Sequence, residues 1–295
     1  MSTVAFIGLG NMGLPMANNL QEEGYEVLGF DLIEGARNAA EKSGISVTAD
    51  SKSAVEKSSV TVTMLPNGEI AKSVANEILD FMPDGSLLID CSTIDVGSAR
   101  STHDAAQQSG KMSLDAPVSG GVVGAEAGTL TFMVGGSKAA YDMGLPLLDI
   151  MGQKAVHCGD GGTGQAAKIC NNMLLAISMI GTCEAFALAE KLNLDQDRLF
   201  DVMSTSSGSC WSVNTYCPIP GVGPSSPADN DYKPGFAAAL MLKDLNLAME
   251  ASSDCGANTL MGSEATRHYQ RMNDLGFGGD DFSAVINRLA ELSKN

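Results

Sequence analysis

The sequence predicts an α/β protein in which a doubly wound, parallel sheet with helices on both faces is followed by an all-α domain, the two joined by a long helix. Three observations predict this fold. Short β-rich runs alternate with helical stretches in the first half, the strand pattern fades after Gly159, and a helical pattern then runs from Gln165 to about Leu192. The 295 residues suffice for about two domains of roughly 150 residues each. We place the boundary so that the domains cover residues 1–163 and 164–295.

Six β-rich runs in the first half predict strands. They lie at residues 4–8, 27–31, 60–65, 86–90, 129–134 and 154–158. Segments of helical composition separate several of them, at residues 12–23, 35–43, 69–81 and 96–109. Because these strands are largely apolar and alternate with helices, they indicate a parallel sheet that is covered on both faces.

The second half is predicted to be helical. After the long helix, helical patterns cover residues 195–204, 236–253, 258–275 and 281–292, with an irregular loop at residues 217–235. The most apolar stretch of the long helix, Met173 to Gly181, has about nine residues, whereas a membrane span needs about 20. We therefore expect a buried helix there and no membrane partner.

Composition excludes several classes of partner and site. The chain has 18 Lys and Arg against 35 Asp and Glu, which gives a formal net charge of −17. A field of this sign repels phosphate backbones and anionic membrane surfaces, which argues against a nucleic-acid partner. The seven cysteines and three histidines show no zinc-site spacing, so no metal site is predicted. The apolar neighbours of Cys170 and Cys183 predict reduced, buried thiols.

The first residues bear on the compartment. The sequence enters a strand pattern at Val4, which leaves no room for a targeting peptide in front of it. We therefore expect a cytoplasmic protein, with the mitochondrial matrix as the alternative if a presequence has been removed.

A glycine-rich loop directly follows the first predicted strand and opens the first helix. It reads Gly8-Leu9-Gly10-Asn11-Met12-Gly13, the pattern G-x-G-x-x-G. In this place the first glycine permits a tight turn, the second lets the backbone approach a pyrophosphate, and the third lets helix and strand pack closely. The helix N-terminus then faces the phosphates. The alternative is a glycine-rich loop without a ligand, but the position of the motif favours a dinucleotide-binding domain of the Rossmann type.

Asp31, at the end of the second predicted strand, favours NAD over NADP. It lies 18 residues beyond the last glycine of the loop, where a carboxylate can accept hydrogen bonds from the adenosine ribose hydroxyls. The same carboxylate repels the 2′-phosphate of NADP by about 1–4 kcal/mol at about 4 Å. No Arg or Lys follows before Arg37. The alternative is an Asp that only caps a helix.

Small polar residues follow the ends of later strands, where ligands bind in open α/β sheets. Leu65-Pro66-Asn67 follows one strand, Ser92-Thr93 follows another, and Asp115 opens a segment that ends in Ser119-Gly120-Gly121. These last three residues offer backbone N–H groups and a hydroxyl, which can hold a carboxylate without a cation. The alternative for such a string is a simple turn.

Lys168 is the candidate general base for a dehydrogenation, because the three histidines lie near no motif. It precedes Asn172 by one helical turn, so the two polar side chains share a face of an otherwise apolar helix. The alternative is a lysine whose ammonium group extends to solvent near the helix start. A second charged pair, Lys243-Asp244, lies in another apolar helix and fits either a site or a structural ion pair.

Four motifs in order resemble the β-hydroxyacid dehydrogenase family. They are F-I-G-L-G-N-M-G-L-P-M-A-N-N-L at residues 6–20, D-A-P-V-S-G-G at 115–121, G-T-G-Q-A-A-K-I-C-N-N at 162–172 and L-M-L-K-D-L at 240–245. The resemblance covers essentially the whole chain, and the segments at 206–211 and 231–236 point to members that act on 3-hydroxyisobutyrate. It implies a Rossmann domain that binds NAD and a helical domain for substrate binding and oligomerisation. The implied reaction is oxidation of 3-hydroxyisobutyrate to methylmalonate semialdehyde, a step of valine degradation.

The resemblance also implies roles for single residues. Lys168 resembles the family's catalytic lysine, the general acid and base that accompanies hydride transfer to nicotinamide C4, and Asn172 resembles its partner in positioning the substrate. Ser119, Gly120 and Gly121 resemble the loop that binds the substrate carboxylate. The residues that resemble cofactor contacts are Leu65, Pro66, Asn67, Thr93 and Lys243. Of these, Asn67 lies in a segment that is shorter than in some relatives.

Two rival functions are open at this point. One is a semialdehyde reductase of the same family that acts on glyoxylate, tartronate semialdehyde or succinate semialdehyde, against which Asp31 and the segment at 206–211 argue. The other is a catalytically silent nucleotide-binding scaffold, against which the presence of Lys168 argues.

The long helix also predicts an oligomer. It is apolar over more of its circumference than one face requires, and about 130 residues follow the domain boundary, which is little material to enclose it. We therefore expect a homodimer or homotetramer in which a partner subunit covers part of the helical domain. In that assembly Lys243, Asp244 and Trp211 are expected to complete the active site from the helical side.

Overall fold

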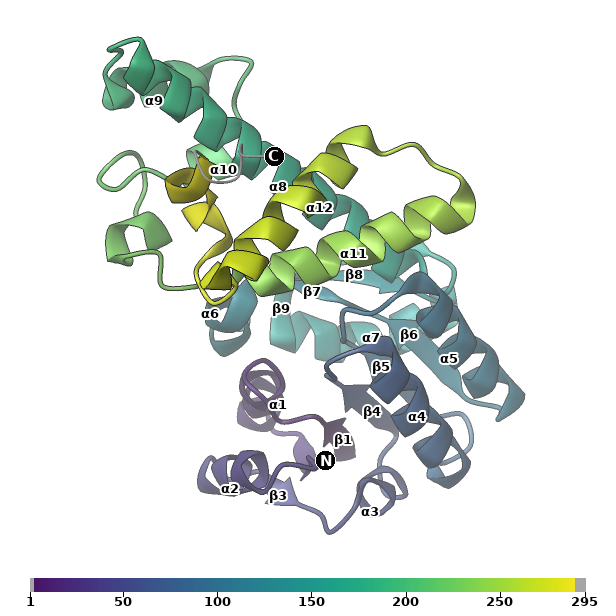
Figure 1. The fold of residues 1–295 in the computed structure, drawn as a ribbon. Coiled ribbons are helices and arrows are strands. Elements are labelled where there is room, and N and C mark those ends of the chain that lie inside the picture. The colour runs from purple at the N-terminus through teal and green to yellow at the C-terminus, as the bar shows by residue number, and fades with distance from the viewer. Residues whose placement is uncertain (1–2, 290–295) are drawn as a thin grey trace. The chain divides into compact units, whose positions relative to one another are not determined.

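The computed structural model describes residues 3–289, and the chain divides into two compact units, Met1–Lys168 and Ile169–Asn295. The predicted fold class is confirmed, since a sheet with helices forms the first unit and helices form the second (Figure 1). The boundary expected after residue 163 and the division after Lys168 both fall in the first turns of one helix, α8 (Thr163–Lys191).

The first unit contains one sheet, whose strand order within residues 3–289 is β3-β2-β1-β4-β5-β6-β8-β7, with β9 paired to β8. The strands are β1 (Thr3–Ile7), β2 (Glu26–Phe30), β3 (Ser46–Val47), β4 (Val60–Thr63), β5 (Leu87–Asp90), β6 (Met112–Asp115), β7 (Val118–Ser119), β8 (Leu130–Gly135) and β9 (Gly152–Gly159). The first six are parallel, in the 3-2-1-4-5-6 order of dinucleotide-binding folds.

The expectation of a parallel sheet is wrong at one edge. Strand β8 runs antiparallel to both β6 and β7 and parallel to β9. The cause is the connection before it, because only the short helix α6 (Gly121–Glu126) separates β7 from β8, too little chain for a parallel crossover.

Helices cover both faces of this sheet (Figure 1). On one face, Met16 and Leu20 of α1 and Leu148 of α7 pack into the core, and on the other face Ile78 of α4 and Ala106 of α5 do so. The helices of the unit besides α6 are α1 (Gly13–Glu22), α2 (Glu34–Lys42), α3 (Ser51–Val55), α4 (Gly68–Ile78), which a 3-10 turn (Leu79–Phe81) extends, α5 (Val96–Gln108) and α7 (Lys138–Met151). The strands are thus covered on both sides, as their apolar sequences predict.

The second unit is helical within the described residues. After α8 come α9 (Gln196–Thr205), α10 (Trp211–Asn214), α11 (Ala238–Cys255) and α12 (Leu260–Met272), with short turns at Pro227–Asn230, Asn273–Phe277 and Phe282–Arg288. Met179 and Cys183 of α8, Leu245 of α11 and Tyr269 of α12 form its core. The helix expected at 281–292 is a 3-10 turn from Phe282 to Arg288, and residues 290–292 of that prediction lie outside the described residues.

Helix α8 is only partly enclosed by its own chain. Its most apolar window has a mean hydropathy of 1.5, which by length and composition alone is enough to cross a membrane. The core helix of a globular protein also meets this criterion of length and composition. Within the protein, 44% of the window is buried. Leu174 and Leu188 are 63% and 60% exposed. Cys170, expected to be buried, is exposed because it lies one turn before Leu174 on the same side of the helix, whereas Cys183 is buried. Burial raises the pKa of the Cys183 thiol well above its usual value.

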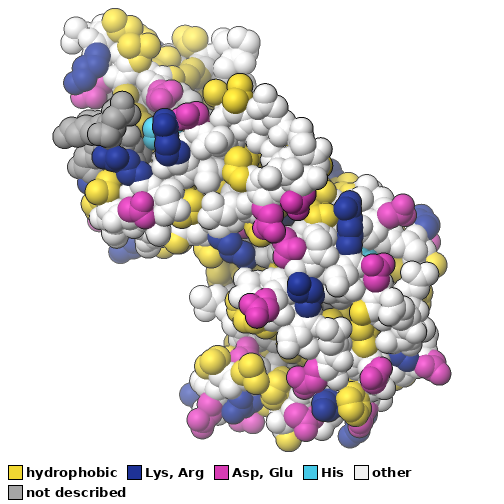
Figure 2. Space-filling view, turned by 45° about the vertical axis from the view of Figure 1, so that its right-hand side comes forward, with side chains coloured by type: hydrophobic (Ala, Val, Ile, Leu, Met, Phe, Trp, Pro, Cys, Tyr) yellow, Lys and Arg dark blue, Asp and Glu magenta, His cyan; other side chains and the backbone are white. Residues whose placement is uncertain are grey.

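The acidic composition produces no single charged patch on the face that Figure 2 draws, where Asp and Glu side chains lie scattered among Lys and Arg side chains. Negative charge on the face drawn is therefore spread out, and a local positive charge near a bound anion has to come from individual residues.

Candidate active site

The carboxyl ends of β1 and β4 lie side by side at the point where the strand order reverses. The loop Gly8–Gly13 follows β1, and Leu65-Pro66 follows β4. Within the glycine-rich loop, Asn11 is exposed and Met12 is half-buried. Open α/β sheets bind nucleotides in the crevice at this switch point. The structure therefore places the predicted dinucleotide loop where the fold binds a dinucleotide.

The first and third glycines of this loop are required by close packing, and the second faces open space. Gly8 has φ +95°, and a Cβ there would lie 2.2 Å from the carbonyl oxygen of Met64. A Cβ on Gly13 would lie 1.9 Å from the carbonyl oxygen of Gly8. A Cβ on Gly10 would meet no atom within 4 Å. The backbone at Gly10 is thus open to a phosphate, so the residues present fit the pyrophosphate of a dinucleotide.

Asp31 joins the glycine-rich loop to the end of β2. Its Oδ2 accepts a hydrogen bond from the buried backbone N–H of Leu9 at 2.7 Å, and its Oδ1 accepts one from the N–H of Ile33 at 2.8 Å. The carboxylate is therefore held at the edge where an adenosine ribose would approach.

Arg37 contacts the backbone at Asp31 and Leu32, directly after β2, which the sequence does not reveal. Its Nη1 donates to the backbone carbonyl oxygens of Asp31 at 2.6 Å and Leu32 at 3.0 Å. The first turn of α2 brings the guanidinium back across six residues. A positive charge thus lies close to Asp31, where the sequence suggested only a negative one.

A buried polar network fixes the loops that follow β4 and β5. Asp90 Oδ1 accepts hydrogen bonds from Thr63 Oγ1 at 2.9 Å and from Ser92 Oγ at 2.5 Å, and Leu65 N–H donates to Ser92 Oγ at 2.8 Å. Burial raises the pKa of the Asp90 carboxyl, although the hydrogen bonds from Ser92 and Thr63 oppose this shift. Leu65 is therefore held in place by the strand next to its own.

The other expected cofactor contacts in this region lie at the same edge. Asn67 is exposed and caps α4, since its Oδ1 accepts a hydrogen bond from Ile70 N–H at 2.9 Å. Pro66 is exposed and Thr93 is half-buried. Asn67 thus has a structural role that the sequence analysis did not assign to it.

The segment Ser119-Gly120-Gly121 forms the turn between β7 and α6. Ser119 pairs with Thr131 of β8, Gly120 has φ +134° and Gly121 has φ +62°. Both glycines adopt backbone conformations that other residues rarely take. Ser119 and Gly121 are half-buried and Gly120 is exposed, so the segment lies partly at the surface of the first unit.

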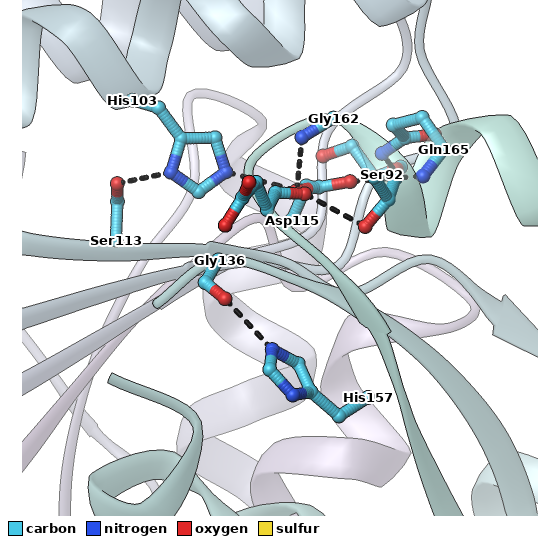
Figure 3. Close-up of polar contacts among 10 residues, drawn as sticks. Ser92, His103, Ser113, Asp115, Gly136, His157, Gly162 and Gln165 are labelled. Carbon is cyan, nitrogen blue, oxygen red and sulfur yellow. Dashed lines mark hydrogen bonds and ion pairs between the residues drawn. The ribbon is translucent and has the colours of Figure 1, made fainter. Parts of the chain in front are cut away.

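Asp115, at the end of β6, gathers several hydrogen bonds in the interior of the first unit (Figure 3). Its Oδ1 accepts from Gly162 N–H at 2.7 Å and its Oδ2 from Gln165 N–H at 2.8 Å. His103 Nε2 lies 2.8 Å from Oδ1, and His103 Nδ1 lies 2.6 Å from Ser113 Oγ. The view that the histidines lie near no motif is therefore wrong for His103, which α5 brings onto the first residue of D-A-P-V-S-G-G.

Lys168 and Asn172 are both buried on α8, one turn apart, with 7% and 2% of their surfaces exposed. A lysine that merely extends to solvent would not be buried to this degree. Lys168 is the last residue of the first unit.

In the second unit, Asn172 pairs with α11. Its Nδ2 donates to Asp244 Oδ2 at 2.6 Å, and its Oδ1 accepts from Asn171 Nδ2 at 3.0 Å. Asp244 is buried and Lys243 beside it is half-buried. Trp211 is 49% exposed and stacks on Tyr216 at 4.7 Å between ring centroids.

Within residues 3–289, no group of three or more His, Cys, Asp or Glu side chains is arranged to hold a metal ion.

The first unit is a dinucleotide-binding domain, and sequence comparison identifies the class of enzyme that contains it. Residues 3–159 match the family described as the NAD binding domain of 6-phosphogluconate dehydrogenase. Residues 162–289 match the family described as NAD-binding of NADP-dependent 3-hydroxyisobutyrate dehydrogenase. Both units thus belong to NAD-dependent hydroxyacid dehydrogenases.

Individual relatives narrow this class. The chain is 48% identical to a probable 3-hydroxyisobutyrate dehydrogenase of Mycobacterium tuberculosis, over 98% of each chain. It is 44% identical to an NAD-dependent L-serine dehydrogenase of Pseudomonas aeruginosa, over 97% of each chain. The solved structure of M. tuberculosis 3-hydroxyisobutyrate dehydrogenase with L-serine superposes with a TM-score of 0.96 at 48% identity, covering 98% of this chain and 99% of that one. The chain belongs to the 3-hydroxyisobutyrate dehydrogenase family.

Membership of this family confirms the expected cofactor, NAD. The open backbone at Gly10 and the fixed carboxylate of Asp31 fit that group. The chain is therefore an oxidoreductase that uses NAD on a hydroxyacid.

Proposed function

We propose that this chain oxidises 3-hydroxyisobutyrate to methylmalonate semialdehyde, a step of valine degradation. The observation that carries this proposal is the burial of Lys168 and Asn172 one turn apart on α8, in a chain that matches its relatives over nearly their whole length. A buried ammonium group has little structural use on an apolar helix, whereas oxidation of an alcohol needs a group that takes the hydroxyl proton.

Lys168 is the general base in this proposal. Its amine takes the proton from the substrate hydroxyl, and the ammonium returns a proton in the reverse direction. Asn172 orients the substrate through its carboxamide, which Asp244 holds at 2.6 Å. The backbone N–H groups and the hydroxyl of Ser119-Gly120-Gly121 bind the substrate carboxylate.

The remaining site residues hold the cofactor. The loop Gly8–Gly13 binds the pyrophosphate, and Asp31 accepts hydrogen bonds from the adenosine ribose. When bound, NAD supplies a hydride acceptor at nicotinamide C4. The other residues assigned to cofactor binding are Leu65, Pro66, Asn67, Thr93 and Lys243.

L-Serine is the second candidate substrate, because a relative named for L-serine is 44% identical and the M. tuberculosis structure is described with L-serine. The two molecules share a primary hydroxyl and a carboxylate. They differ at the central carbon, which carries a methyl group in one and an ammonium group in the other. The discriminating contact is therefore the one to that substituent, since a site shaped for a methyl group leaves an ammonium group without partners.

A side-by-side assay separates these candidates. Initial rates are measured with 3-hydroxyisobutyrate, L-serine and a panel of related hydroxyacids, each with NAD and with NADP. We expect the highest kcat/KM with 3-hydroxyisobutyrate and NAD. A higher kcat/KM with L-serine would identify L-serine as the substrate in place of 3-hydroxyisobutyrate. If no hydroxyacid is turned over, the protein is a catalytically silent nucleotide-binding scaffold.

We also propose that the protein is a homo-oligomer in the cytoplasm. The exposed leucines of the second unit support the assembly, since Leu174, Leu188 and Leu192 are each at least 60% exposed. Large apolar side chains gathered on one helix and its end favour burial against another subunit. In this assembly the partner covers α8, and Trp211 and Lys243 contribute to the site from the helical side.

A further inference from the structure

The start of α8 is fastened to the sheet by two hydrogen bonds to one carboxylate (Figure 3). Gly162 N–H donates to Asp115 Oδ1 at 2.7 Å and Gln165 N–H donates to Asp115 Oδ2 at 2.8 Å. The first N–H groups of a helix have no partners within the helix, and a carboxylate there satisfies them and is stabilised by the helix dipole. Asp115 thus fixes where α8 begins.

Gln165 ties the same turn to the loop after β5. Its side chain is fully buried. Gln165 Nε2 donates to the carbonyl oxygen of Ser92 at 2.7 Å, and Gln165 Oε1 accepts from Ile94 N–H at 3.1 Å. Both polar atoms of the carboxamide are therefore used on the two residues that flank Thr93, which fixes the rotation of the helix about its own axis.

The carboxylate that receives Gln165 is itself enclosed. His103 Nε2 lies 2.8 Å from Asp115 Oδ1, and Ser113 Oγ lies 2.6 Å from the other ring nitrogen. A Cβ on Gly135 would lie 2.4 Å from Asp115 Oδ1, and one on Gly164 would lie 2.8 Å from Oδ2. The Asp115 side chain consequently has one position open to it.

We propose that Gln165 is a positioning residue for Lys168, with Asp115 as its anchor. This inference rests on the proposed role of Lys168 as general base. Lys168 follows Gln165 by three residues and lies on the adjoining side of the next turn. Successive side chains of a helix are rotated by about 100° about its axis. If the position and the rotation of the helix start are fixed, the direction in which Lys168 leaves the helix is therefore fixed too. All the contacts named lie within the first unit, Met1–Lys168.

The central test variant is Gln165→Met, which keeps the length and volume of the side chain and removes both hydrogen bonds. We expect kcat to fall by about 10- to 100-fold, as displacement of a reacting group by about 1 Å can cause. The KM for NAD is expected to change by less than about threefold, because Asp90 and Leu65 still hold Ser92. The pH of half-maximal kcat is expected to move by at least about half a unit, since the surroundings of the proposed base change.

A matched control removes a similar contact elsewhere in the first unit. His157 Nε2 lies 2.7 Å from the carbonyl oxygen of Gly136, and the ring stacks on Tyr141 at 4.8 Å. His157→Phe keeps the stacking and loses the hydrogen bond, so it reports the effect of general destabilisation. It is expected to leave kcat and its pH profile unchanged.

A double-mutant cycle with Lys168→Ala decides whether Gln165 acts through Lys168. If it does, Gln165→Met lowers kcat in the wild-type chain but changes the residual kcat of Lys168→Ala by less than about twofold. Equal factors in the two backgrounds would overturn the proposal, as would an unchanged kcat and pH profile in Gln165→Met. If Lys168→Ala itself retains wild-type activity, the proposed role of Lys168 as general base fails first. The failure of that role is thereby distinguished from the failure of the role of Gln165.

A second variant covers the case in which Gln165→Met does not fold. Gln165→Glu is isosteric and keeps the acceptor for Ile94 N–H, but it places an oxygen against the carbonyl oxygen of Ser92. It is expected to show the same non-additivity with Lys168→Ala, with thermal unfolding and NAD binding confirming that the chain is folded. Additive effects in this variant would also overturn the proposal.

Discussion

The carboxamide of Asn172 donates a hydrogen bond to the carboxylate of Asp244 at 2.6 Å, across 72 positions of sequence, and both side chains are buried. A carboxamide nitrogen carries two hydrogens, so this bond orients the group and leaves the second hydrogen for another acceptor. Asn172 is therefore presented by α11 in one orientation, as a residue that positions a substrate has to be. The sequence alone fits the charged pair Lys243-Asp244 to either a site or a structural ion pair. In the structure the carboxylate of Asp244 holds Asn172, the residue proposed to position the substrate.

The first prediction concerns the proposed general base. Lys168→Ala is expected to lower kcat by about 10²–10⁴-fold while NAD binding stays nearly intact, because general acid–base groups contribute in this range. Steady-state kinetics with a cofactor titration measure both quantities. Lys191→Ala, an exposed lysine in the last turn of the same helix, is the control and is expected to have wild-type kcat. More than about a tenth of wild-type kcat in Lys168→Ala would remove this residue from the role.

The second prediction concerns cofactor preference. Asp31→Ser combined with Leu32→Arg is expected to shift the preference towards NADP, because the change removes a repulsive carboxylate and adds a phosphate partner. Leu32 is 79% exposed, so an arginine fits there without burial. The ratio of kcat/KM for the two cofactors is expected to move by about five- to several-hundred-fold.

Arg37 supplies a control for this cofactor experiment, because its guanidinium already lies at the Asp31 and Leu32 carbonyl groups. Adding Arg37→Ala to the double variant is expected to return part of the preference to NAD. A wild-type chain that already prefers NADP would show that the charge of Arg37 outweighs that of Asp31.

The third prediction concerns assembly. Light scattering at micromolar concentration is expected to give a mass of two or four times the 30.5 kDa of one chain. Introducing Leu174→Asp and Leu188→Glu on α8 is expected to reduce this mass, because a charge at an apolar interface has to be desolvated. Leu32→Glu, at a still more exposed leucine of the first unit, is the control and is expected to leave the mass unchanged. A wild-type mass near that of one chain contradicts the assembly.

The fourth prediction concerns the pH dependence of stability. Burial raises the folded-state pKa of Asp90, so the folded protein binds this proton more tightly than the unfolded chain does. Its contribution to stability is therefore present below pH about 4 and is lost as the pH rises through the raised pKa. Asp90→Asn keeps an oxygen that can accept from Thr63 and Ser92 and removes the titration.

The difference in free energy of unfolding between Asp90→Asn and wild type is expected to grow with pH. The free energy of unfolding of Asp90→Asn, relative to wild type, is expected to rise above pH about 4 by at most about 1.4 kcal/mol per pH unit. Denaturant unfolding across about pH 2–8 measures the difference, because the effect of Asp90→Asn develops above pH about 4 and that of the control below it. Asp84→Asn is the control of opposite sign, because a hydrogen bond from Lys111 lowers the pKa of that exposed carboxyl and the stability it gives is lost as the pH falls. A difference in free energy of unfolding between Asp90→Asn and wild type that does not depend on pH would contradict a raised pKa of Asp90 in the folded protein.

Local patterns in the sequence predict the fold class and the nucleotide loop because the physics behind them is local. A strand followed by three spaced glycines and a helix determines its own turn, and the steric contacts at Gly8 and Gly13 bear this out. Contacts between distant segments depend on register, which one sequence does not reveal. His103 meets Asp115 only because α5 packs on β6 in one register, and Asn172 meets Asp244 only because α8 packs against α11.

The antiparallel edge of the sheet escaped prediction for a related reason. The direction of β8 depends on the length of the connection after β7, and β7 has only two residues, too few for a recognisable pattern. Arg37 lies six positions after Asp31 in sequence, and the first turn of α2 brings its guanidinium back to the Asp31 carbonyl group.

The hydrogen bonds of Asp115 also determine where this protein can be divided. Its carboxylate in β6 receives N–H groups that lie 47 and 50 positions further along the chain. A fragment cut after Gly159, where the last strand ends, would bury that carboxylate without them, whereas one cut after Lys168 keeps them. The segment that keeps these hydrogen bonds when it is separated from the rest of the chain is consequently the sheet together with the first turns of the following helix. Chimeras that exchange the nucleotide-binding unit between relatives should therefore include the first turns of α8, up to Lys168, together with the strands.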